Sequence, residues 1–419
     1  MRTAIYRTMA DGVPVFIAGI FPVFAVVAPK GTVLVLILAG VTGLGLAIRQ
    51  RALRELFPPV LASLALLALV WTFFKSLTVF DGSITIALWL RLTGLTLCGF
   101  GSIWLFRTLP LKTKQRVQNA LIMGIMISLL VLLLAVIASY FGLPGLPDPD
   151  YPDPLVHFSS GQMIVAILSA LASSVLLVRC RPIGAICLFL ATLLIFLPMS
   201  SLIAIVALIG AAFGVVFGRL LPRIGLIVMG AVLMISVLVA PLGLLFIPDN
   251  FAESPILKDT LRPFVSVQGL DRSVQHRFQI WQFVKDRAME RPYAGWGLDA
   301  SRRLPGGKKL TSLGEARLPL HPHNGILQVW LELGVPGVIL LSLFVGYVVI
   351  GPGNGRAPPN AAAVRIGMAL PAMIVGCLAF GIWQNWWVAS LWMSAALASS
   401  FSAADFPVGG DSGENDRRQ

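Results

Sequence analysis

Charged side chains are scarce in this sequence: Asp, Glu, Lys and Arg make up 12% of its 419 residues, whereas 57% are hydrophobic. This composition excludes an ordinary soluble domain, in which roughly a quarter of the residues are charged. A single membrane anchor is also excluded, because one span needs only about 20 apolar residues. The sequence therefore predicts an all-α polytopic membrane protein.

Cysteine and histidine are rare too, with four residues of each. Cys98, Cys180, Cys187 and Cys377 show neither a CxxC pair nor a Cys/His spacing suited to a metal, and we expect no disulfide. The sequence also contains no P-loop or other nucleotide-binding fingerprint. We therefore expect neither a metal nor another cofactor.

Apolar windows long enough for a membrane span recur along nearly the whole chain. We predict about twelve spans, at residues 13–29, 31–48, 57–74, 83–106, 117–141, 160–178, 182–198, 200–218, 223–247, 323–349, 361–382 and 384–403. The first window is interpreted as a retained span, because it lacks the small-residue cleavage site of a signal peptide. The tightest connection is predicted at residues 198–201.

The net charge of +13 raises the question of a nucleic-acid partner, but the placement of the cations favours a topological explanation. With the N-terminus in the cytoplasm, the cations of the short connections gather on that side: Arg2, Arg7, Arg49, Arg51, Arg54, Arg107, Lys112, Lys114, Arg116, Arg179, Arg181, Arg219, Arg223, Arg356 and Arg365. The short outer connections carry only Lys30 and Lys75. This bias predicts cytoplasmic termini and no nucleic-acid partner.

One long polar segment, residues 248–322, is predicted on the outer side, between spans nine and ten. It divides the chain into spans one to nine (1–247), the loop (248–322), spans ten to twelve (323–403) and a cytoplasmic tail (404–419). The loop contains twelve Lys and Arg against eight Asp and Glu. Two explanations stay open: a solvated loop too long to obey the positive-inside rule, or an anion site whose arginines match phosphate geometry.

Within the loop, apolar spacing predicts a helix over residues 273–292, capped by Ser273 and stopped by Pro292. Arg277 and Trp281 are four residues apart and share a face of it. The arginine stem either simply packs on the indole, or is held there so that the guanidinium can bind phosphate. The glycine-rich stretch at 292–309 that follows adds four cations and a weak indication of a phosphate-contacting loop.

Only two ionisable residues are predicted deep inside spans, Arg91 and Glu332, each roughly 12 Å from the outer end of its helix. Equal depth permits an ion pair between them, and this is the interpretation we favour. The alternative is that Arg91 binds an anionic lipid headgroup and that Glu332 adjusts the properties of Arg91. Asn324, Gln328 and Glu332 lie four residues apart on one stripe, which predicts that this helix lines a polar cavity.

Two of the four histidines precede the same helix, in the stretch HPHNG at residues 321–325. His323 is predicted at the positive end of the helix dipole, which favours a neutral ring able to accept a proton. The alternative is an interfacial histidine that caps the helix or contacts headgroups. His321 is the weaker candidate for a base, and the pair lacks a third ligand for a metal.

Together these features resemble the O-antigen ligase family, which also includes O-antigen polymerases and some protein oligosaccharyltransferases. The residues that carry the resemblance lie between 277 and 337: Arg277, Trp281, Pro292, Gly295, Gly297, His323, Asn324, Glu332, Gly334 and Gly337. Outside this region the agreement is limited to the number and hydropathy of the spans.

The resemblance implies a metal-independent, inverting glycosyltransferase of the GT-C kind at the periplasmic face of a bacterial inner membrane. Its donor would be a polysaccharide on undecaprenyl diphosphate, and its acceptor a sugar hydroxyl of the lipid A core, so that the product is lipopolysaccharide. On this hypothesis His323 activates the acceptor hydroxyl, and Arg277 together with a second arginine holds the diphosphate. The candidates for the second arginine, chosen by charge and position, are Arg91, Arg262, Arg272 and Arg302.

The remaining predicted substrate-binding residues are His321, Asn324, Gln328, Glu332 and Trp281. Two alternative functions stay open. An O-antigen polymerase would use the same donor but a second lipid-linked glycan as acceptor. A polysaccharide-lipid transporter or flippase would also have many spans and buried charges, although the sequence shows neither an inverted repeat nor a matching pair of broken helices.

Overall fold

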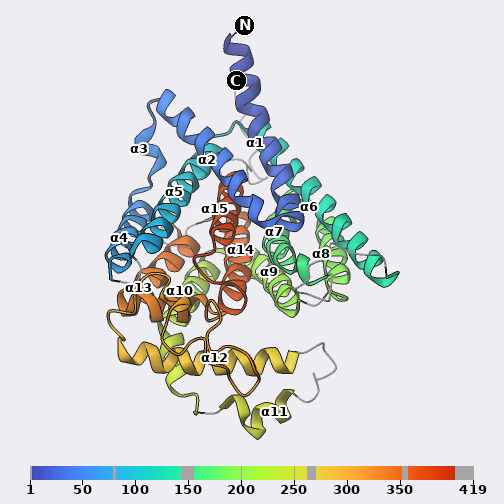
Figure 1. The fold of residues 1–419 in the computed structure, drawn as a ribbon. Helices are drawn as coiled ribbons and strands as arrows, with labels where there is room; N and C mark the ends of the chain where they lie inside the picture. Colours follow the sequence, from blue (N-terminus) through green and yellow to red (C-terminus); the bar gives the residue numbers. More distant parts are fainter. Residues whose placement is uncertain are drawn as a thin grey trace.

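A computed structural model describes residues 2–78, 82–142, 155–199, 201–249, 251–261, 270–351 and 357–401. Arg262, Arg356 and the predicted tail 404–419 lie outside the described residues. The described part is a bundle of long helices, with a smaller helical segment across one end (Figure 1).

Each of the twelve predicted spans corresponds to one helix. They are α1 (Arg2–Val27), α2 (Thr32–Arg49), α4 (Pro59–Ser76), α5 (Gly82–Arg107), α6 (Leu111–Tyr140), α7 (Ser159–Val178), α8 (Pro182–Phe196), α9 (Leu202–Leu220), α10 (Pro222–Leu245), α13 (Gly325–Ile350), α14 (Pro359–Leu378) and α15 (Asn385–Ser399). Among the described residues, nine helices are long and apolar enough to cross a membrane. Two further apolar helices are shorter than these: the apolar part of α1, Gly12–Val27, and α8. The predicted polytopic membrane fold is confirmed.

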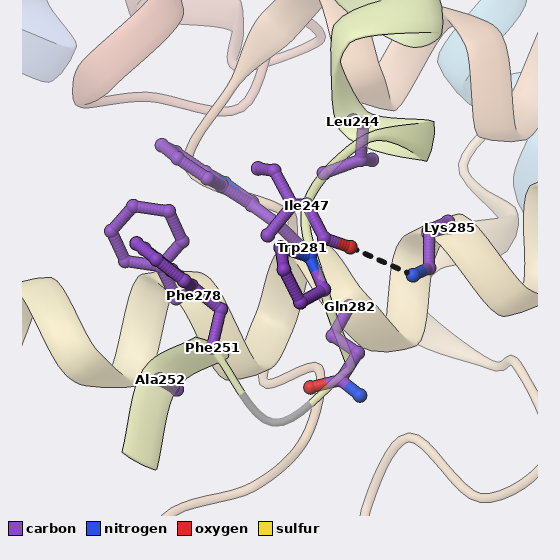
Figure 2. Close-up of a pocket in the computed structure, with 9 residues that line it drawn as sticks. Leu244, Ile247, Phe251, Ala252, Phe278, Trp281, Gln282 and Lys285 are labelled. Carbon is purple, nitrogen blue, oxygen red and sulfur yellow. Dashed lines mark hydrogen bonds between the residues drawn. The ribbon is translucent and has the colours of Figure 1, made fainter. Parts of the chain in front are cut away.

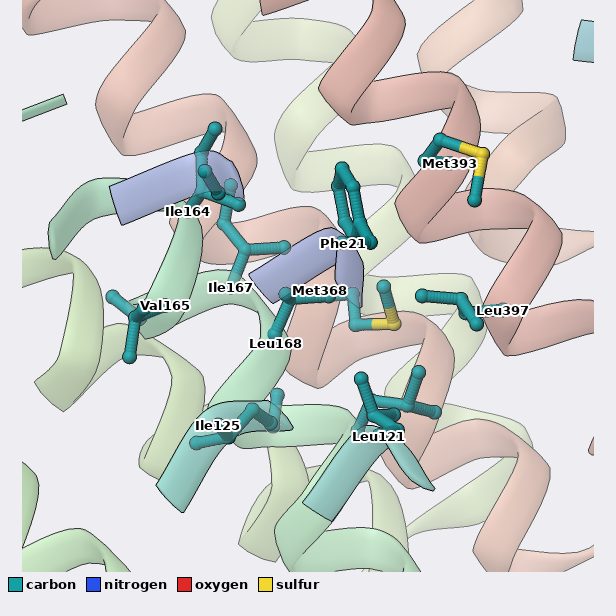
Figure 3. Close-up of a cluster of buried hydrophobic side chains, with 14 of the residues drawn as sticks. Phe21, Leu121, Ile125, Ile164, Val165, Ile167, Leu168, Met368, Met393 and Leu397 are labelled. Carbon is teal, nitrogen blue, oxygen red and sulfur yellow. The ribbon is translucent and has the colours of Figure 1, made fainter. Parts of the chain in front are cut away.

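Helix α7 lies at the centre of the bundle. Of the residues in its most apolar stretch, 78% are buried. It packs against α1, α8, α9 and α14. Figure 3 shows the side chains that meet there: Phe21 of α1, Leu121 and Ile125 of α6, Ile164 and Leu168 of α7, Met368 of α14, and Met393 and Leu397 of α15. This core ties the first spans of the chain to the last ones.

Helix α5, which carries Arg91, is held by α2, α4 and α15. Small residues allow the α2 contact to be close, because a Cβ at Gly40 or Gly43 would overlap the backbone of α5 at Cys98 or Gly101. Such close approach is a main source of helix association in lipid, where apolar surface alone gives little driving force. The backbone that presents Arg91 is therefore fixed on three sides.

The predicted outer loop contains η3 (Phe251–Glu253), α11 (Pro255–Leu261), α12 (Leu270–Glu290) and η5 (Ala300–Arg302). The helix predicted at 273–292 is α12, which begins three residues before Ser273 and ends before Pro292. Its buried stripe of Ile280, Val284 and Ala288 packs on the beginning of α13, in a core separate from that around α7. In Figure 1, α12 lies across the end of the bundle and α11 lies farther out.

Aromatic side chains anchor α12 to the end of α10. Figure 2 shows Phe251, Phe278 and Trp281 gathered beside Ile247, where Lys285 Nζ donates a hydrogen bond to the Ile247 carbonyl at 3.3 Å. The cavity between them is only about 10 Å³, room for about one water molecule. This contact is an anchor and not a substrate cavity.

Candidate functional site

Helix α13 is broken at Gly334, whose φ of 67° and ψ of −165° are not helical, two residues before Pro336. Groups from outside α13 bind the carbonyls that flank the break: Trp296 N donates to Leu331 O at 2.9 Å, Gly297 N to Glu332 O at 2.8 Å, and Trp71 Nε1 to Leu333 O at 3.0 Å. On the other side, Val335 N donates to Pro292 O at 3.1 Å. The break satisfies the rule that irregular backbone at membrane depth is tolerated only where protein covers it.

Two glycines allow the loop to reach the break. A Cβ on Gly334 would overlap the carbonyl oxygen of Tyr293, and one on Gly295, where φ is 66°, would overlap that of Glu332. Because the two backbones touch, neither position has room for a side chain. This contact accounts for a glycine at each of these two positions of the chain.

Replacing Gly334 with alanine is expected to lower the free energy of unfolding by at least about 2 kcal/mol, because strained backbone and overpacking each cost of the order of 1–3 kcal/mol. Thermal melting in detergent measures the effect. The matched control is Gly376→Ala in α14, where a Cβ meets nothing within 4 Å. Equal melting temperatures for the two variants would contradict the contact described here.

Glu332 is completely buried, and its carboxylate accepts hydrogen bonds from four residues. One oxygen accepts from Asp299 N at 2.7 Å and from Trp383 Nε1 at 2.6 Å. The other accepts from Gln328 Nε2 at 3.0 Å, Ser301 N at 3.3 Å and the Ser301 hydroxyl. The predicted ion pair between Glu332 and Arg91 is wrong, because protein N–H and O–H groups occupy the carboxylate instead.

Beside Glu332 lies a polar cavity of about 330 Å³. Its cations are Arg91 of α5 and Arg302 and Arg303 of the outer loop, and the other polar residues that line it are Asp299, His321, Gln328, Gln384 and Asn385. Arg91 makes no ion pair or hydrogen bond with any described residue. Burial raises the pKa of Asp299, against the lowering effect of Arg302 and Arg303.

His321 lines this cavity, and the ring of His323 lies beside it with 4.4 Å between the ring centroids. His323 Nδ1 lies 3.0 Å from the carbonyl of Ala379, which can only accept a hydrogen bond. The Nδ1 atom must therefore carry a proton, and in the neutral ring the Nε2 lone pair is available. Burial and the charges of Arg277 and His276 lower the pKa of His323 despite the opposing bond to Ala379, so a neutral ring at pH 7 is expected.

His321 is held in the complementary tautomer. Its Nδ1 accepts from the backbone N–H of His323 at 3.2 Å, so the proton of the neutral ring is on Nε2. Nε2 faces the side-chain amide of Gln384 at 3.3 Å, and a 180° flip of that amide would place its oxygen there as acceptor. Burial, with the charges of His323 and Arg302, lowers the pKa of His321 to about 3.

This lowered pKa predicts acid sensitivity. Between about pH 6.5 and pH 3 the unfolded chain binds a proton at His321 that the folded protein does not, so the contribution to stability falls as the pH falls. The loss should approach about 1.4 kcal/mol for each pH unit. Melting temperatures from pH 7 to pH 4 should therefore fall more steeply for the wild type than for His321→Gln, and parallel slopes would contradict the prediction.

Arg277 of α12 is partly buried and makes no hydrogen bond or ion pair with a described residue. Its effect on the pKa of His323 places its charge near that ring. The indole of Trp281 meets Phe278 edge-on, and its Nε1 donates to the carbonyl of Pro322 at 3.0 Å, which connects α12 to the segment carrying the histidines.

The other predicted site residues separate into three groups. Gln328 lines the cavity, as the polar stripe predicted, but Asn324 is the N-cap of α13 and accepts from Ile326 N and Leu327 N. Arg272 lies at the surface, 61% exposed and paired with Glu315 at 3.1 Å, and does not line the cavity. Arg302 lines it, with Nε on Asp299 Oδ1 at 3.0 Å.

Among the cavity residues that sequence reasoning missed are four with charged or amide side chains: Asp299, Arg303, Gln384 and Asn385. Arg303 carried a signal, because it adjoins Arg302 in the glycine-rich stretch. The stretch GIWQNWW at residues 381–387 also contained a usable indication, since its Gln and Asn interrupt an otherwise apolar sequence. Lys308 and Lys309, the other cations of that stretch, are exposed and outside the cavity.

The fold and cavity thus define a polytopic membrane protein with a cationic, histidine-containing site at one end of its bundle. Residues 154–342 match the family model described as O-antigen ligase. This region contains α7 to α10, the outer loop and the first part of α13. The predicted resemblance to the O-antigen ligase family is confirmed over these residues.

Three rickettsial proteins, each provisionally named a polysaccharide ligase, are similar to part of the chain. The Rickettsia conorii protein is 36% identical over 126 residues, 29% of this chain and 30% of the relative. The Rickettsia felis protein is 35% identical over 126 residues, and the Rickettsia bellii protein 37% over 131, each 29% of this chain and 31% of the relative. The matched stretch thus spans less than a third of these relatives.

Proposed function

We propose that this protein is an O-antigen ligase, which transfers a polysaccharide from undecaprenyl diphosphate to a sugar hydroxyl of the lipid A core at the periplasmic face of a bacterial inner membrane. The observation that carries the proposal is the gathering of arginines beside two histidines at the end of the bundle, where Arg91 and Arg277 make no ion pair with a described residue. The match to the O-antigen ligase family supports the reaction class. Donor, acceptor and sidedness are part of the proposal.

The arginines suit a lipid-linked diphosphate. Arg91 and Arg302 face one cavity, and Arg277 lies beside the adjoining His323. A diphosphate that leaves a sugar gains negative charge on its terminal oxygens, and fixed guanidinium groups stabilise that charge most where water is excluded. The cavity opens beside apolar α5 residues, Ile84 and Leu88, which suits a donor with a hydrocarbon tail.

The imidazole suits the acceptor. His323 Nε2 takes the proton of the acceptor hydroxyl as its oxygen bonds to the anomeric carbon, and the bond from that carbon to the diphosphate breaks on the opposite side. The glycan is inverted at this carbon, and undecaprenyl diphosphate leaves with the bonding electron pair. The hydrogen bond from Nδ1 to the Ala379 carbonyl orients the ring and supports the positive charge that it acquires.

The test is a transfer assay with purified protein, undecaprenyl diphosphate carrying a defined glycan, and lipid A-core as acceptor, in detergent with EDTA. The proposal expects glycosylated core and released undecaprenyl diphosphate. A parallel reaction without core distinguishes a polymerase, which would lengthen the lipid-linked glycan. Loss of transfer in EDTA would contradict the metal-independent mechanism, and no covalent product in either reaction would contradict both transferase assignments and favour a flippase.

A further inference from the structure

The Glu332 carboxylate lies where three separate parts of the chain meet. Asp299 and Ser301 belong to the outer loop, Gln328 to the same turn of α13, and Trp383 to the connection between α14 and α15. The Gln328 amide extends the junction, because its oxygen accepts from Ile382 N at 2.9 Å. Each of these segments contributes to the wall of the 330 Å³ cavity.

The carboxylate has no capacity left for a substrate. Two backbone N–H groups, one indole N–H, one amide N–H and one hydroxyl converge on its two oxygens. An ionised carboxylate accepts about four hydrogen bonds, and bonds to a charged group are about twice as strong as neutral ones. A group this saturated and completely buried holds its neighbours in place rather than contacting a ligand.

One of the segments that Glu332 holds is the turn that carries Arg302. The backbone N–H groups of Asp299 and Ser301 are on Glu332, and the Asp299 carboxylate in turn accepts from Arg302 Nε at 3.0 Å. Asp299 has a left-handed backbone, with φ of 58°, a conformation that is uncommon for residues with a side chain, although aspartate tolerates it better than most. With Nε occupied, the two terminal nitrogens of Arg302 remain for the cavity.

We propose that Glu332 is a positioning residue, which sets Arg302 and Trp383 on the walls of the cavity so that Arg302 meets the diphosphate of the donor opposite Arg91. This inference rests on the proposed function of that cavity. It replaces the sequence-based expectation that Glu332 itself binds substrate or adjusts Arg91 through an ion pair. Glu332 acts through Arg302 and does not touch the reacting atoms.

A glutamine at 332 tests the proposal because it preserves the volume and removes one acceptor. Its amide NH₂ has to face either Asp299 N and Trp383 Nε1, or Ser301 and Gln328, and in each orientation donor meets donor. Replacing Trp383 with phenylalanine removes one of the opposing donors. Glu332→Gln should therefore be less harmful in the Trp383→Phe background than in the wild type. A double-mutant cycle measures this coupling.

The experiment measures KM for the lipid-linked donor, KM for the core acceptor, and the pH profile of kcat in Glu332→Gln, Trp383→Phe and the double variant. We expect Glu332→Gln to raise the donor KM about tenfold, consistent with a lost hydrogen bond to a charged group. The acceptor KM and the pH profile should stay unchanged, because His323 keeps its bond to Ala379. The double variant should recover at least about a third of the lost donor affinity on a logarithmic scale.

Two controls separate this role from general stability. Glu315→Gln changes an exposed loop carboxylate, and Trp104→Phe a buried indole whose nitrogen has no hydrogen-bond partner among the described residues, so neither should alter the donor KM. Amide hydrogen exchange at residues 299–303 should rise in Glu332→Gln, and this readout does not depend on any reaction. If melting temperature falls in step with activity and the double variant recovers nothing, the role is structural only and the proposal is overturned.

Failure of this proposal is distinct from failure of the proposed function. If the wild type transfers glycan but Glu332→Gln keeps its donor KM, or raises the acceptor KM instead, positioning of Arg302 is overturned while the ligase assignment stands. If the wild type transfers nothing, the ligase assignment fails and the diphosphate role proposed here fails with it, whatever the exchange data show.

Discussion

His323→Ala is expected to lower the turnover of glycan transfer by about 10²–10⁴, the usual contribution of a positioned general base. The loss should fall on kcat at saturating donor and acceptor, because the ring acts on the proton that leaves in the transition state. Single-turnover transfer to lipid A-core, in detergent at pH 7.5, measures it.

Two controls make this result specific. His323→Gln can still donate to the Ala379 carbonyl, so the fold of the α13 entrance should survive while the base is lost. His157→Ala removes an exposed histidine of η2 (Val156–Phe158) and should change turnover less than twofold. Activity near the wild-type level in a folded His323→Ala protein would show that the base is elsewhere.

The membrane spans were predictable because each rests on a local property. Twelve apolar windows have the length of a span, and each corresponds to one helix. The helix at 273–292 was predictable for the same reason, since its apolar spacing and Pro292 act within a few residues. The glycines at 295 and 334 were also identified in the sequence, as part of the family resemblance. Only the structure shows that they contact each other.

The partners of the polar residues were not predictable, because long-range contacts decide them. Equal depth made Arg91 and Glu332 suitable for an ion pair. The backbone N–H groups of Asp299 and Ser301, 33 and 31 residues upstream, donate to the carboxylate instead. Trp281 is four residues from Arg277 on one helix, and its indole nitrogen donates to the Pro322 carbonyl of a distant segment. In both cases a backbone group from a distant segment, invisible in a residue pattern, is the partner of the polar side chain.

The break in α13 links these observations. A continuous helix would keep its own carbonyls occupied and leave no reason for residues 292–297 to enter the bundle. The break at Gly334 exposes them, the loop binds there, and Glu332, two residues before the break, then meets Asp299 and Ser301. The outer loop is thereby fixed on a membrane helix, which gives its arginines a rigid support near the histidines.

Arg277→Ala is expected to lower kcat/KM for the lipid-linked donor by about 10²–10³, the cost of removing one fixed donor that stabilises developing negative charge. Arg277→Lys should lose less, because it keeps the charge but not the planar fork that matches phosphate. The matched control is Arg272→Ala, five residues earlier on α12, where the side chain is exposed and paired with Glu315, and where we expect less than a twofold change.

Loss of the nearby guanidinium also raises the pKa of His323, so the acid limb of the Arg277→Ala pH profile should move to higher pH. An Arg277→Ala protein with the wild-type donor kcat/KM would remove this arginine from the diphosphate site and leave Arg91 and Arg302 as its cations.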